Sequence, residues 1–413
     1  MDSCNLDLGN DKDFIPFERR KSISILLGAG FSAPMGYPIG NELNDGLLNF
    51  DETIYFAPCG SLACSNDGSK LTFQNEDIFN NHQKYFIFCM RLIQEYSKEH
   101  TFDYEEFYDF IKGEDVKQEK YQRLCTDLLT DYENFDHYLF NIGHIYNQMV
   151  AHLLKDKNRK SWYDDEPFKQ NYFDGYNGFL QYLSSLSEKF IVHVHTLNHD
   201  LLFESFNKTG MINGMISDGF DEYRSKYYGK LNYNNSTYYC RLERFTNRYN
   251  TPIRLYKLHG SLNYVPFYRQ NKDGSMIKEK YVKIKWGIGP DNIMKERKSN
   301  AGYDLSPFEY HADFLTGTTS KIQRYNEPLL FRKLFKKFRK NLQNAEKLII
   351  IGYGCKDLGI NDMIKENFDY IHKPAFIIDP YAKEDTPVYQ LKKDIKAQLI
   401  KVDLDKLGKK DFD

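Results

Sequence analysis

The sequence has no Cys-x-x-Cys pair, no long apolar run and no strong excess of either charge. Its seven cysteines are scattered and odd in number, which argues against a disulfide framework and against a zinc knuckle. The longest apolar runs fall far below the roughly 20 residues that a membrane-spanning helix needs. A formal net charge of −2 gives no sign of a nucleic-acid partner, although a local basic patch is compatible with it. We therefore expect a cytoplasmic protein with no membrane partner.

The composition that remains is that of a globular chain with a sizeable core. Apolar residues make up 41% of the 413 residues and charged residues 28%, and Tyr (32) and Phe (31) are common. Such numbers of aromatic residues favour well-filled cores and broad protein interfaces. The length corresponds to two or three domains, or to one α/β domain with an inserted lobe.

The first organising stretch runs from Ser22 to Ser32. Its apolar residues predict a buried parallel strand that ends at Gly28-Ala29-Gly30, and we expect a helix to begin near Ser32. A strand, a glycine-rich turn and a helix start together indicate a nucleotide-phosphate site, because ligands can approach bare N–H groups there. Glycines also end strands for purely structural reasons.

Two later segments repeat this strand-then-polar pattern. Lys189–Thr196 predicts a strand followed by Asn198 and Asp200, and Ile253–Leu258 predicts a strand followed by His259. Polar residues at the carboxyl ends of parallel strands are where α/β folds place ligand chemistry, and a histidine there suits proton transfer. The structural alternatives are that Asp200 only caps the next helix and that His259 is a hydrogen-bonded structural residue.

The C-terminal third predicts more of the same sheet. Buried strands at 347–351 and 374–378 end at Gly352-Tyr353-Gly354 and at Asp379, and a last strand covers Gln398–Val402. Leu329–Asn344 predicts an amphipathic crossover helix with a basic, solvated face, and Asp357 is expected to cap the helix that follows it. The alternation of strands and helices predicts an α/β fold, a Rossmann-like parallel sheet covered by helices on both faces.

A large, mostly helical insertion is predicted after the first strand and helix. Apolar residues recur at helical spacing in His82–His100, Tyr104–Ile111, Lys117–Leu129 and Phe135–Leu154, and a further helix covers Tyr176–Glu188. We therefore expect an N-terminal segment (1–20), a Rossmann-like core (21–50 and 189–413) and an inserted lobe (51–188). Within the core, Leu262–Trp286 predicts strands with a turn at 272–274, and Gly287–Ser320 is expected to be irregular.

Three histidines raise a metal site as an alternative. His193 and His195 share one strand face because side chains alternate with period two, and His199 follows shortly after. A cysteine such as Cys240 or Cys355 would have to complete the ligand set. Pairs of this kind are more often packed or solvent-facing, so no metal is expected.

These segments together resemble the sirtuin superfamily. Gly28-Ala29-Gly30-Phe31-Ser32 is similar to its phosphate turn, and the stretch that contains Pro38 is similar to its cofactor loop. Thr196-Leu197-Asn198-His199-Asp200 resembles the family's Thr-x-Asn-x-Asp motif, and Leu258-His259-Gly260 resembles the motif with its essential histidine. Gly352, Tyr353 and Asp379 fall where the family contacts the adenosine half of NAD.

The resemblance implies NAD as the substrate and a role for each motif. Ala29 and Gly30 would hold the diphosphate through N–H groups, with Ser32 adding a hydroxyl. Asn198 would hold a ribose hydroxyl or the attacking water, Asp200 the nicotinamide carboxamide, and His259 would accept a proton. No metal is required for that chemistry.

Two departures point to one branch of this superfamily. No cysteine lies between Cys240 and Cys355, so the zinc module of the protein-deacylating sirtuins is absent, and the insertion is large. These features resemble the sirtuin-like NAD hydrolases of bacterial anti-phage defence. That resemblance implies an NAD+ glycohydrolase, an oligomer, and a partner such as a hexameric DNA-translocase-type ATPase or an Argonaute, with nucleic acid only as an indirect trigger. A protein deacylase and a non-catalytic NAD or ADP-ribose sensor are the alternatives.

Overall fold

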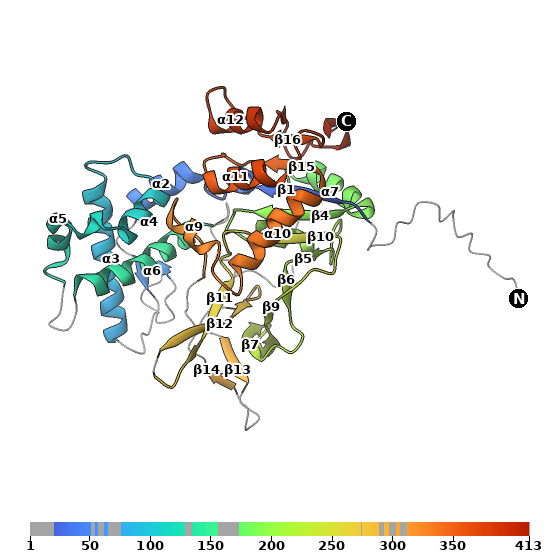
Figure 1. Cartoon of the computed structure of the whole chain (residues 1–413). Coiled ribbons are helices and arrows are strands. Elements are labelled where there is room, and N and C mark those ends of the chain that lie inside the picture. The colour runs from blue at the N-terminus through green and yellow to red at the C-terminus, as the bar shows by residue number, and fades with distance from the viewer. Residues whose placement is uncertain are drawn as a thin grey trace, which may run out of the picture.

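A computed structural model gives the fold around these motifs. It describes residues 20–50, 54–56, 62–64, 76–128, 134–155, 173–273, 275–288, 293–296, 303–305 and 312–412. The predicted N-terminal segment up to residue 19 lies outside the described residues. Figure 1 shows a central sheet with helices around it, a helical lobe to the left of the sheet and antiparallel strands below it.

The central sheet has seven strands in the order β17-β16-β15-β1-β4-β10-β5, and its strand pairs are parallel. This confirms the predicted α/β class. The strands are β1 (Ser22–Leu27), β4 (Ile191–Thr196), β5 (Ile216–Ser217), β10 (Ile253–Lys257), β15 (Ala345–Ile351), β16 (Ala375–Ile378) and β17 (Gln398–Ile400). Their near-continuous apolar runs fit this arrangement, because a parallel strand is buried on both faces.

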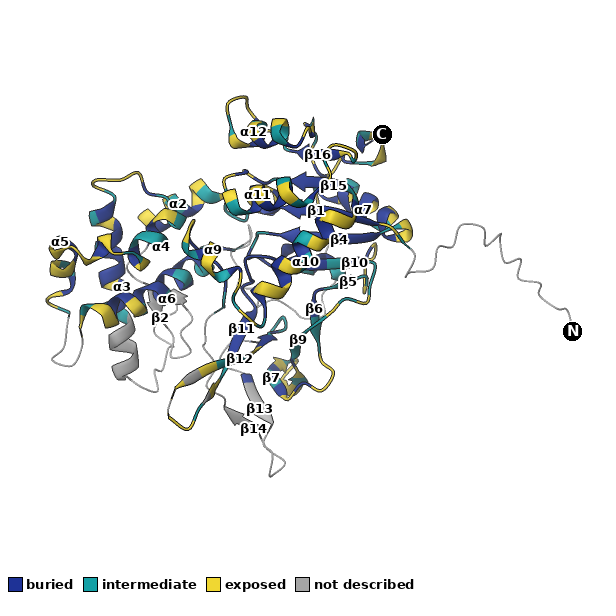
Figure 2. Ribbon diagram, in the orientation of Figure 1, coloured by how far each residue is buried: buried dark blue, intermediate teal, exposed yellow. Residues whose placement is uncertain are grey.

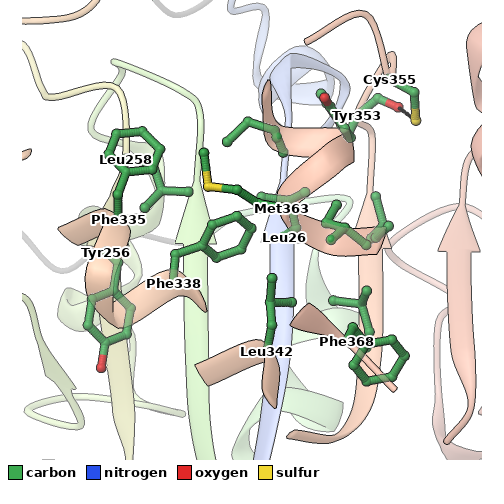
Figure 3. Close-up of a cluster of buried hydrophobic side chains, with 14 of the residues drawn as sticks. Leu26, Tyr256, Leu258, Phe335, Phe338, Leu342, Tyr353, Cys355, Met363 and Phe368 are labelled. Atoms are coloured by element: carbon green, nitrogen blue, oxygen red, sulfur yellow. Dashed lines mark hydrogen bonds between the residues drawn. The ribbon is translucent and has the colours of Figure 1, made fainter. Parts of the chain in front are cut away.

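Helices cover both faces of this sheet. One face packs against α10 (Phe331–Asn344) and α11 (Leu358–Asn367), and α12 (Pro387–Asp394) joins the same cluster. Figure 3 shows Phe338 and Leu342 of α10 beside Leu26 of β1. The other face packs against α7 (Asn177–Lys189) and α8 (Leu202–Ser205).

Alternate residues of each strand serve the two faces. Ile349 and Ile351 of β15 belong to the cluster under α7, whereas Leu348 and Ile350 belong to the cluster under α10. This alternation follows from the period of two along a strand. Figure 2 shows the result as dark blue strands between helices whose outer sides are exposed.

The helical lobe has its own apolar core. Its helices are α2 (Gly40–Leu48), α3 (Glu76–Tyr96), α4 (Tyr104–Lys112), α5 (Glu119–Gln122) and α6 (Phe135–Leu153). The lobe also includes a two-stranded sheet of β2 (Ile54–Phe56) and β3 (Leu62–Cys64). Leu262 and Phe314, which come from the other part of the chain, join the core of the lobe. The lobe is therefore packed against the end of the central sheet that carries those residues.

The predicted helix over Lys117–Leu129 is wrong as a single element. The chain forms a 3₁₀ turn at Asp115–Lys117, the short α5, and a second 3₁₀ turn at Arg123–Cys125. Side-chain contacts stabilise this irregular path. The Arg91 guanidinium donates to the Leu124 carbonyl at 2.8 Å and to Asp127 at 2.7 Å.

Two four-stranded antiparallel sheets form a β unit below the central sheet (Figure 1). Their strands are β6 (Gly219–Asp221), β7 (Tyr227–Tyr233), β8 (Ser236–Arg241), β9 (Glu243–Arg248), β11 (Tyr264–Gln270), β12 (Met276–Lys283), β13 (Ile293–Glu296) and β14 (Tyr303–Leu305). The hairpin of β11 and β12 confirms the predicted strands, whereas β13 and β14 lie in a stretch predicted to be irregular. Among the described residues, no helix is both long and apolar enough to cross a membrane.

Candidate functional site

The predicted polar residues gather along one edge of the central sheet, which we call the rim. The rim consists of the residues that follow the carboxyl ends of five neighbouring strands, β16, β15, β1, β4 and β10. Chain order reverses between β1 and β15, since β4 and β10 lie on one side of β1 and β16 lies beyond β15. Open α/β sheets bind their ligands at such a reversal, outside the carboxyl ends of the strands.

The turns after β1 and β15 touch each other at the reversal. The Gly28 N–H donates to the Ile351 carbonyl at 3.0 Å, and the Gly30 N–H donates to the Gly352 carbonyl at 2.9 Å. A Cβ on Gly28 would lie 2.6 Å from Cα of Tyr353. Gly352 has a φ of +59°. Glycine is therefore required here by the close approach of two backbones.

The same contacts bear on the expected phosphate turn. The helix after this turn, α1 (Ala29–Ser32), begins three residues earlier than predicted and has a single turn. Ala29 and Gly30 are exposed on the rim. Because the Gly30 N–H already has the Gly352 carbonyl as acceptor, a phosphate would have to compete for it. The role of this turn in binding a diphosphate stays a prediction.

Asn198 and Ser32 meet on the rim between β1 and β4. The Nδ2 group of Asn198 donates to Oγ of Ser32 at 2.9 Å and to the Gly28 carbonyl at 3.0 Å. The Asn198 backbone N–H donates to Oγ1 of Thr196 at 3.0 Å. These bonds fix the orientation of the amide. Within the described part of the chain, Oδ1 of Asn198 has no hydrogen-bond partner, so this acceptor is free to meet a ligand.

Asp200 is buried and closes a turn just before α8 (Leu202–Ser205). Its Oδ1 accepts the Leu202 N–H at 2.9 Å, and its carbonyl accepts from Nζ of Lys257. Lys257 is fully buried and forms an ion pair with Glu204 at 3.0 Å. Asp200 is therefore not the N-cap of α8, which is Leu201 and has no side-chain cap bond. The role of Asp200 in holding an amide stays a prediction.

His259 lies on the rim at the end of β10, the strand next to β4. It is 4% exposed, and its Nε2 atom lies 3.4 Å from Oδ2 of Asp357, outside hydrogen-bond geometry. Its carbonyl accepts the Leu315 N–H at 2.7 Å, which fixes the backbone beneath the ring. The sequence placed this histidine correctly at a strand end.

Asp357 belongs to a buried network of charges around His259. Lys321 lies between two carboxylates, 3.0 Å from Oδ2 of Asp357 and 3.0 Å from Oε1 of Glu105. Burial acts to raise the pKa of Asp357, but His259, Lys321 and the Ile360 N–H outweigh it and hold the pKa well below its usual value. Asp357 is therefore a firmly ionised carboxylate beside the histidine.

His199 lies near His259 and is held in its neutral form. Its ring packs on Phe314 with centroids 4.5 Å apart and lies 6.3 Å from the ring of His259. Burial lowers the pKa of His199 well below its usual value, and the nearby His259, Lys257 and Lys321 act in the same direction.

The remaining predicted residues lie along the same rim with partners of their own. Tyr353 is buried, and its hydroxyl donates to the Asp357 carbonyl and to Asn361, each at 3.0 Å. Asp379 follows β16, and its Oδ1 accepts the Tyr381 N–H at 2.9 Å. Pro38 lies in the loop before α2 and is half-buried. Their roles in binding a nucleotide stay predictions.

The three histidines of the metal alternative do not gather around one point. His193 and His195 share a face of β4, as predicted, and pack against Tyr256 at ring-centroid distances of 5.7 and 5.0 Å. Nε2 of His195 accepts from Nδ2 of Asn341 at 3.1 Å. His199 lies instead beside His259. Across the described ranges, no group of three or more His, Cys, Asp or Glu side chains is arranged to hold a metal ion.

Sequence reasoning missed the charge network. Asp357 was predicted as a helix cap, and its Oδ1 does accept the Ile360 N–H at 3.1 Å, but its second contact was not predicted. Glu105 and Lys321 lie 216 residues apart and carry no motif. A charged residue in a helical pattern normally faces solvent, so only the folded chain reveals these two.

No family model and no curated protein matches the chain. Two solved structures are similar to it. One is a Sir2 homologue in complex with NAD, at 12% identity and a TM-score of 0.32, with 94% of this chain and 87% of that chain covered. The other is a structure concerned with the mechanism and regulation of Sir2 enzymes, at 12% identity and a TM-score of 0.29, with 92% and 94% covered. A TM-score below 0.5 does not establish a shared fold, so the proposal below rests on this chain's own residues.

Proposed function

We propose that the chain is an NAD+ glycohydrolase, which cleaves NAD+ to nicotinamide and ADP-ribose. The supporting observation is that Ser32, Asn198 and His259 follow the ends of three neighbouring strands, β1, β4 and β10, and that Asn198 donates to Ser32. An amide with a free oxygen and a histidine beside an ionised carboxylate are the groups that a hydrolysis of this kind needs. The sirtuin resemblance of the three motifs supplies the identity of the substrate.

The chemistry places modest demands on the protein. The bond between C1′ of the ribose and the nicotinamide nitrogen breaks, water adds to C1′, and one proton is released. The leaving group is already cationic on its ring and needs no acid, so positioning and electrostatic stabilisation of the oxocarbenium-like transition state dominate.

Each rim residue then has a defined task. Oδ1 of Asn198, whose amide is fixed by Ser32 and Gly28, would accept from a ribose hydroxyl or from the attacking water. His259 would take the proton that the water or a ribose hydroxyl loses. The exposed turn at Ala29 and Gly30 would face the diphosphate.

The test is NAD+ consumption by the purified chain beside the Asn198→Ala and His259→Ala variants, with nicotinamide and ADP-ribose followed by chromatography. We expect product from the wild type and a loss of about 100-fold or more in each variant, the range for removing a group that transfers or positions a proton. Asn344→Ala serves as a matched control, because this asparagine ends α10 at the opposite end of the sheet.

The outcome separates three functions. NAD+ turnover in the wild type and the control but not in the two variants supports the hydrolase. Nicotinamide release that requires an acyl-lysine peptide indicates the deacylase instead. NAD+ that binds and is never converted, alone or with DNA, indicates the sensor, and unchanged turnover in both variants overturns the site.

We further propose, from the resemblance alone, that this activity depletes NAD in a bacterial anti-phage defence system and requires oligomerisation or a partner ATPase or Argonaute. Cellular NAD measured after phage infection, with wild type and Asn198→Ala compared, tests this part. Equal NAD levels in the two infected cultures would contradict it.

A further inference from the structure

The charge network of Asp357, Lys321 and Glu105 beside His259 has no role in the reaction as proposed so far. Oδ2 of Asp357 accepts from Nζ of Lys321 at 3.0 Å and from the Tyr325 hydroxyl at 3.3 Å, and Nε2 of His259 lies 3.4 Å from it. The Asp357 side chain is only 7% exposed. A buried carboxylate interacts strongly with a neighbouring polar atom, here Nε2 of His259.

We propose that Asp357 is a positioning residue for His259, one that keeps the imidazole proton on Nε2 and leaves Nδ1 as the base. The inference rests on the proposed function, in which His259 accepts a proton. Asp357 itself does not touch the substrate in this scheme.

The argument for the tautomer is electrostatic. A neutral imidazole carries its proton on one ring nitrogen and a lone pair on the other. If the lone pair were on Nε2, it would face the negative oxygen of Asp357 across 3.4 Å in a buried site. With the proton on Nε2 the same contact is attractive, and Nδ1 then presents its lone pair. Carboxylates commonly fix histidine tautomers and orientations in this way.

Asp357 is itself held firmly in place. Its Oδ1 accepts the Ile360 N–H at 3.1 Å and so caps α11, a ten-residue helix packed on the sheet. Its Oδ2 accepts from Lys321 and Tyr325. A side chain fixed at both oxygens can hold the ring of His259 in one orientation.

The helical lobe contributes to this arrangement through Glu105. Both carboxylate oxygens of this α4 residue accept from Nζ of Lys321, at 3.0 and 3.1 Å. Lys321 is 2% exposed and would be a costly buried cation without these partners. The lobe therefore helps to place the lysine that in turn holds Asp357.

Other groups near His259 do not compete for the same ring nitrogen. The ring of Tyr325 lies parallel to that of His259 with centroids 6.5 Å apart, and the ring of His199 lies at 6.3 Å. Lys321, which also contacts Asp357, is a cation and cannot accept a hydrogen bond from the His259 ring. Asp357 is thus the carboxylate that contacts the imidazole directly.

The decisive variant is Asp357→Asn, because asparagine also caps helices well and so keeps the Oδ1 contact with Ile360. Asp218→Asn is the matched control, since it neutralises another buried carboxylate that pairs with a lysine, Lys283, at 2.6 Å. Two-bond ¹H–¹⁵N correlation spectra of histidine-labelled protein report which ring nitrogen carries the proton. The peaks missing from His259→Ala identify His259.

We expect the Nε2–H tautomer for His259 in the wild type and in Asp218→Asn, and a shift toward Nδ1–H in Asp357→Asn. An Nδ1–H tautomer in the wild type, or no shift in Asp357→Asn, overturns the proposal. Because this measurement needs no substrate, it stands even if the chain proves not to hydrolyse NAD+.

Kinetics supply the second readout. We expect kcat for NAD+ to fall about 10- to 100-fold in Asp357→Asn with KM little changed, as when a group that orients a histidine is lost. A rise in KM with unchanged kcat would show that Asp357 serves binding and would overturn the positioning role.

The lobe's share is tested with Glu105→Gln against Asp109→Asn. Asp109 also joins α4 to the chain before α9 (Ser320–Arg324), through hydrogen bonds from Thr318 at 2.6 Å and Thr319 at 2.7 Å, but it does not contact Lys321. We expect a smaller kcat loss in Glu105→Gln than in Asp357→Asn, and none in Asp109→Asn. Equal losses in the two lobe variants would mean that docking of the lobe, and not the charge of Glu105, is what matters.

Discussion

Two groups of buried histidines in this protein differ in what faces them. His259 lies on the rim beside the carboxylate of Asp357. His193 and His195 lie inside the sheet, facing the neutral partners Tyr256 and Asn341 at 3.1 Å. The comparison teaches that burial alone does not make a histidine reactive, because a partner that orients its ring is also needed.

The pKa values of the inner pair are set mainly by burial. Burial lowers the pKa of His195 to about 3 and that of His193 to about 2, and the neighbouring ring of His195 adds to the effect on His193. Both rings are therefore neutral at any physiological pH. Their role is to fill and to hydrogen-bond the α10 face of the sheet.

The largest difference between the two groups of histidines is expected in catalytic activity. His259→Gln should lower NAD+ turnover by about 100-fold or more, because glutamine cannot accept the proton. His195→Gln should leave kcat and KM close to wild type, since this ring is enclosed between Tyr256 and Phe338. Steady-state kinetics on the two variants side by side give the answer. Equal losses would place the inner histidines in the catalytic machinery and refute the distinction.

The pH dependence of stability should report the inner pair. A histidine with a folded-state pKa below that of the unfolded chain binds its proton only on unfolding, so stability falls as pH drops below about 6.5. For His195 this loss continues down to pH of about 3. Each such histidine contributes a slope of about 1.4 kcal/mol per pH unit in that window.

The measurement is urea unfolding of wild type and His195→Gln between pH 6 and pH 4.5, limits chosen to lie above the usual carboxylate pKa of about 4. His144, whose pKa burial lowers to about 4, and His193 remain in both proteins. The slope should therefore be smaller in His195→Gln by about one proton, or roughly 1.4 kcal/mol per pH unit. Parallel curves would mean that His195 is not held neutral by the fold.

A smaller effect is expected at Asn341, which donates to Nε2 of His195 at 3.1 Å from the buried side of α10. Asn341→Ala should lower the unfolding free energy by about 1–3 kcal/mol, because it leaves a buried acceptor without its donor. NAD+ turnover should not change. Urea unfolding at pH 7 measures the first effect, and a loss of activity without a loss of stability would contradict the structural role.

The contrast between the two groups was only partly predictable. The strands that carry them, β4 and β10, were predicted correctly, because each is a run rich in strand-forming residues, such as Ile191–Thr196. The rim was predicted as well, since Asn198 and His259 directly follow such runs. The partners of the histidines were not, because Asn341 and Asp357 approach from helices that lie far along the chain.

Part of the β unit was missed for a different physical reason. β8 (Ser236–Arg241) is almost entirely exposed and has no alternation of apolar and polar residues, so it gives no strand signal. β11 and β12 were predicted because a Lys-Asp-Gly turn separates two β-rich runs. A strand such as β8, which lies largely in solvent, is specified by its pairing with β7 more than by its own pattern.

The smallest expected effect separates the two roles of Asp357. Asp357→Ala removes both the cap of α11 and the charge beside His259, whereas Asp357→Asn removes only the charge. The alanine variant should therefore be less stable than the asparagine variant by about 1 kcal/mol, the usual contribution of an N-cap. Both variants should lose turnover to a similar extent, because activity depends on the carboxylate and stability on the cap. If turnover followed stability across the two variants, Asp357 would be a structural cap, and His259 would have no charged partner that matters for the reaction.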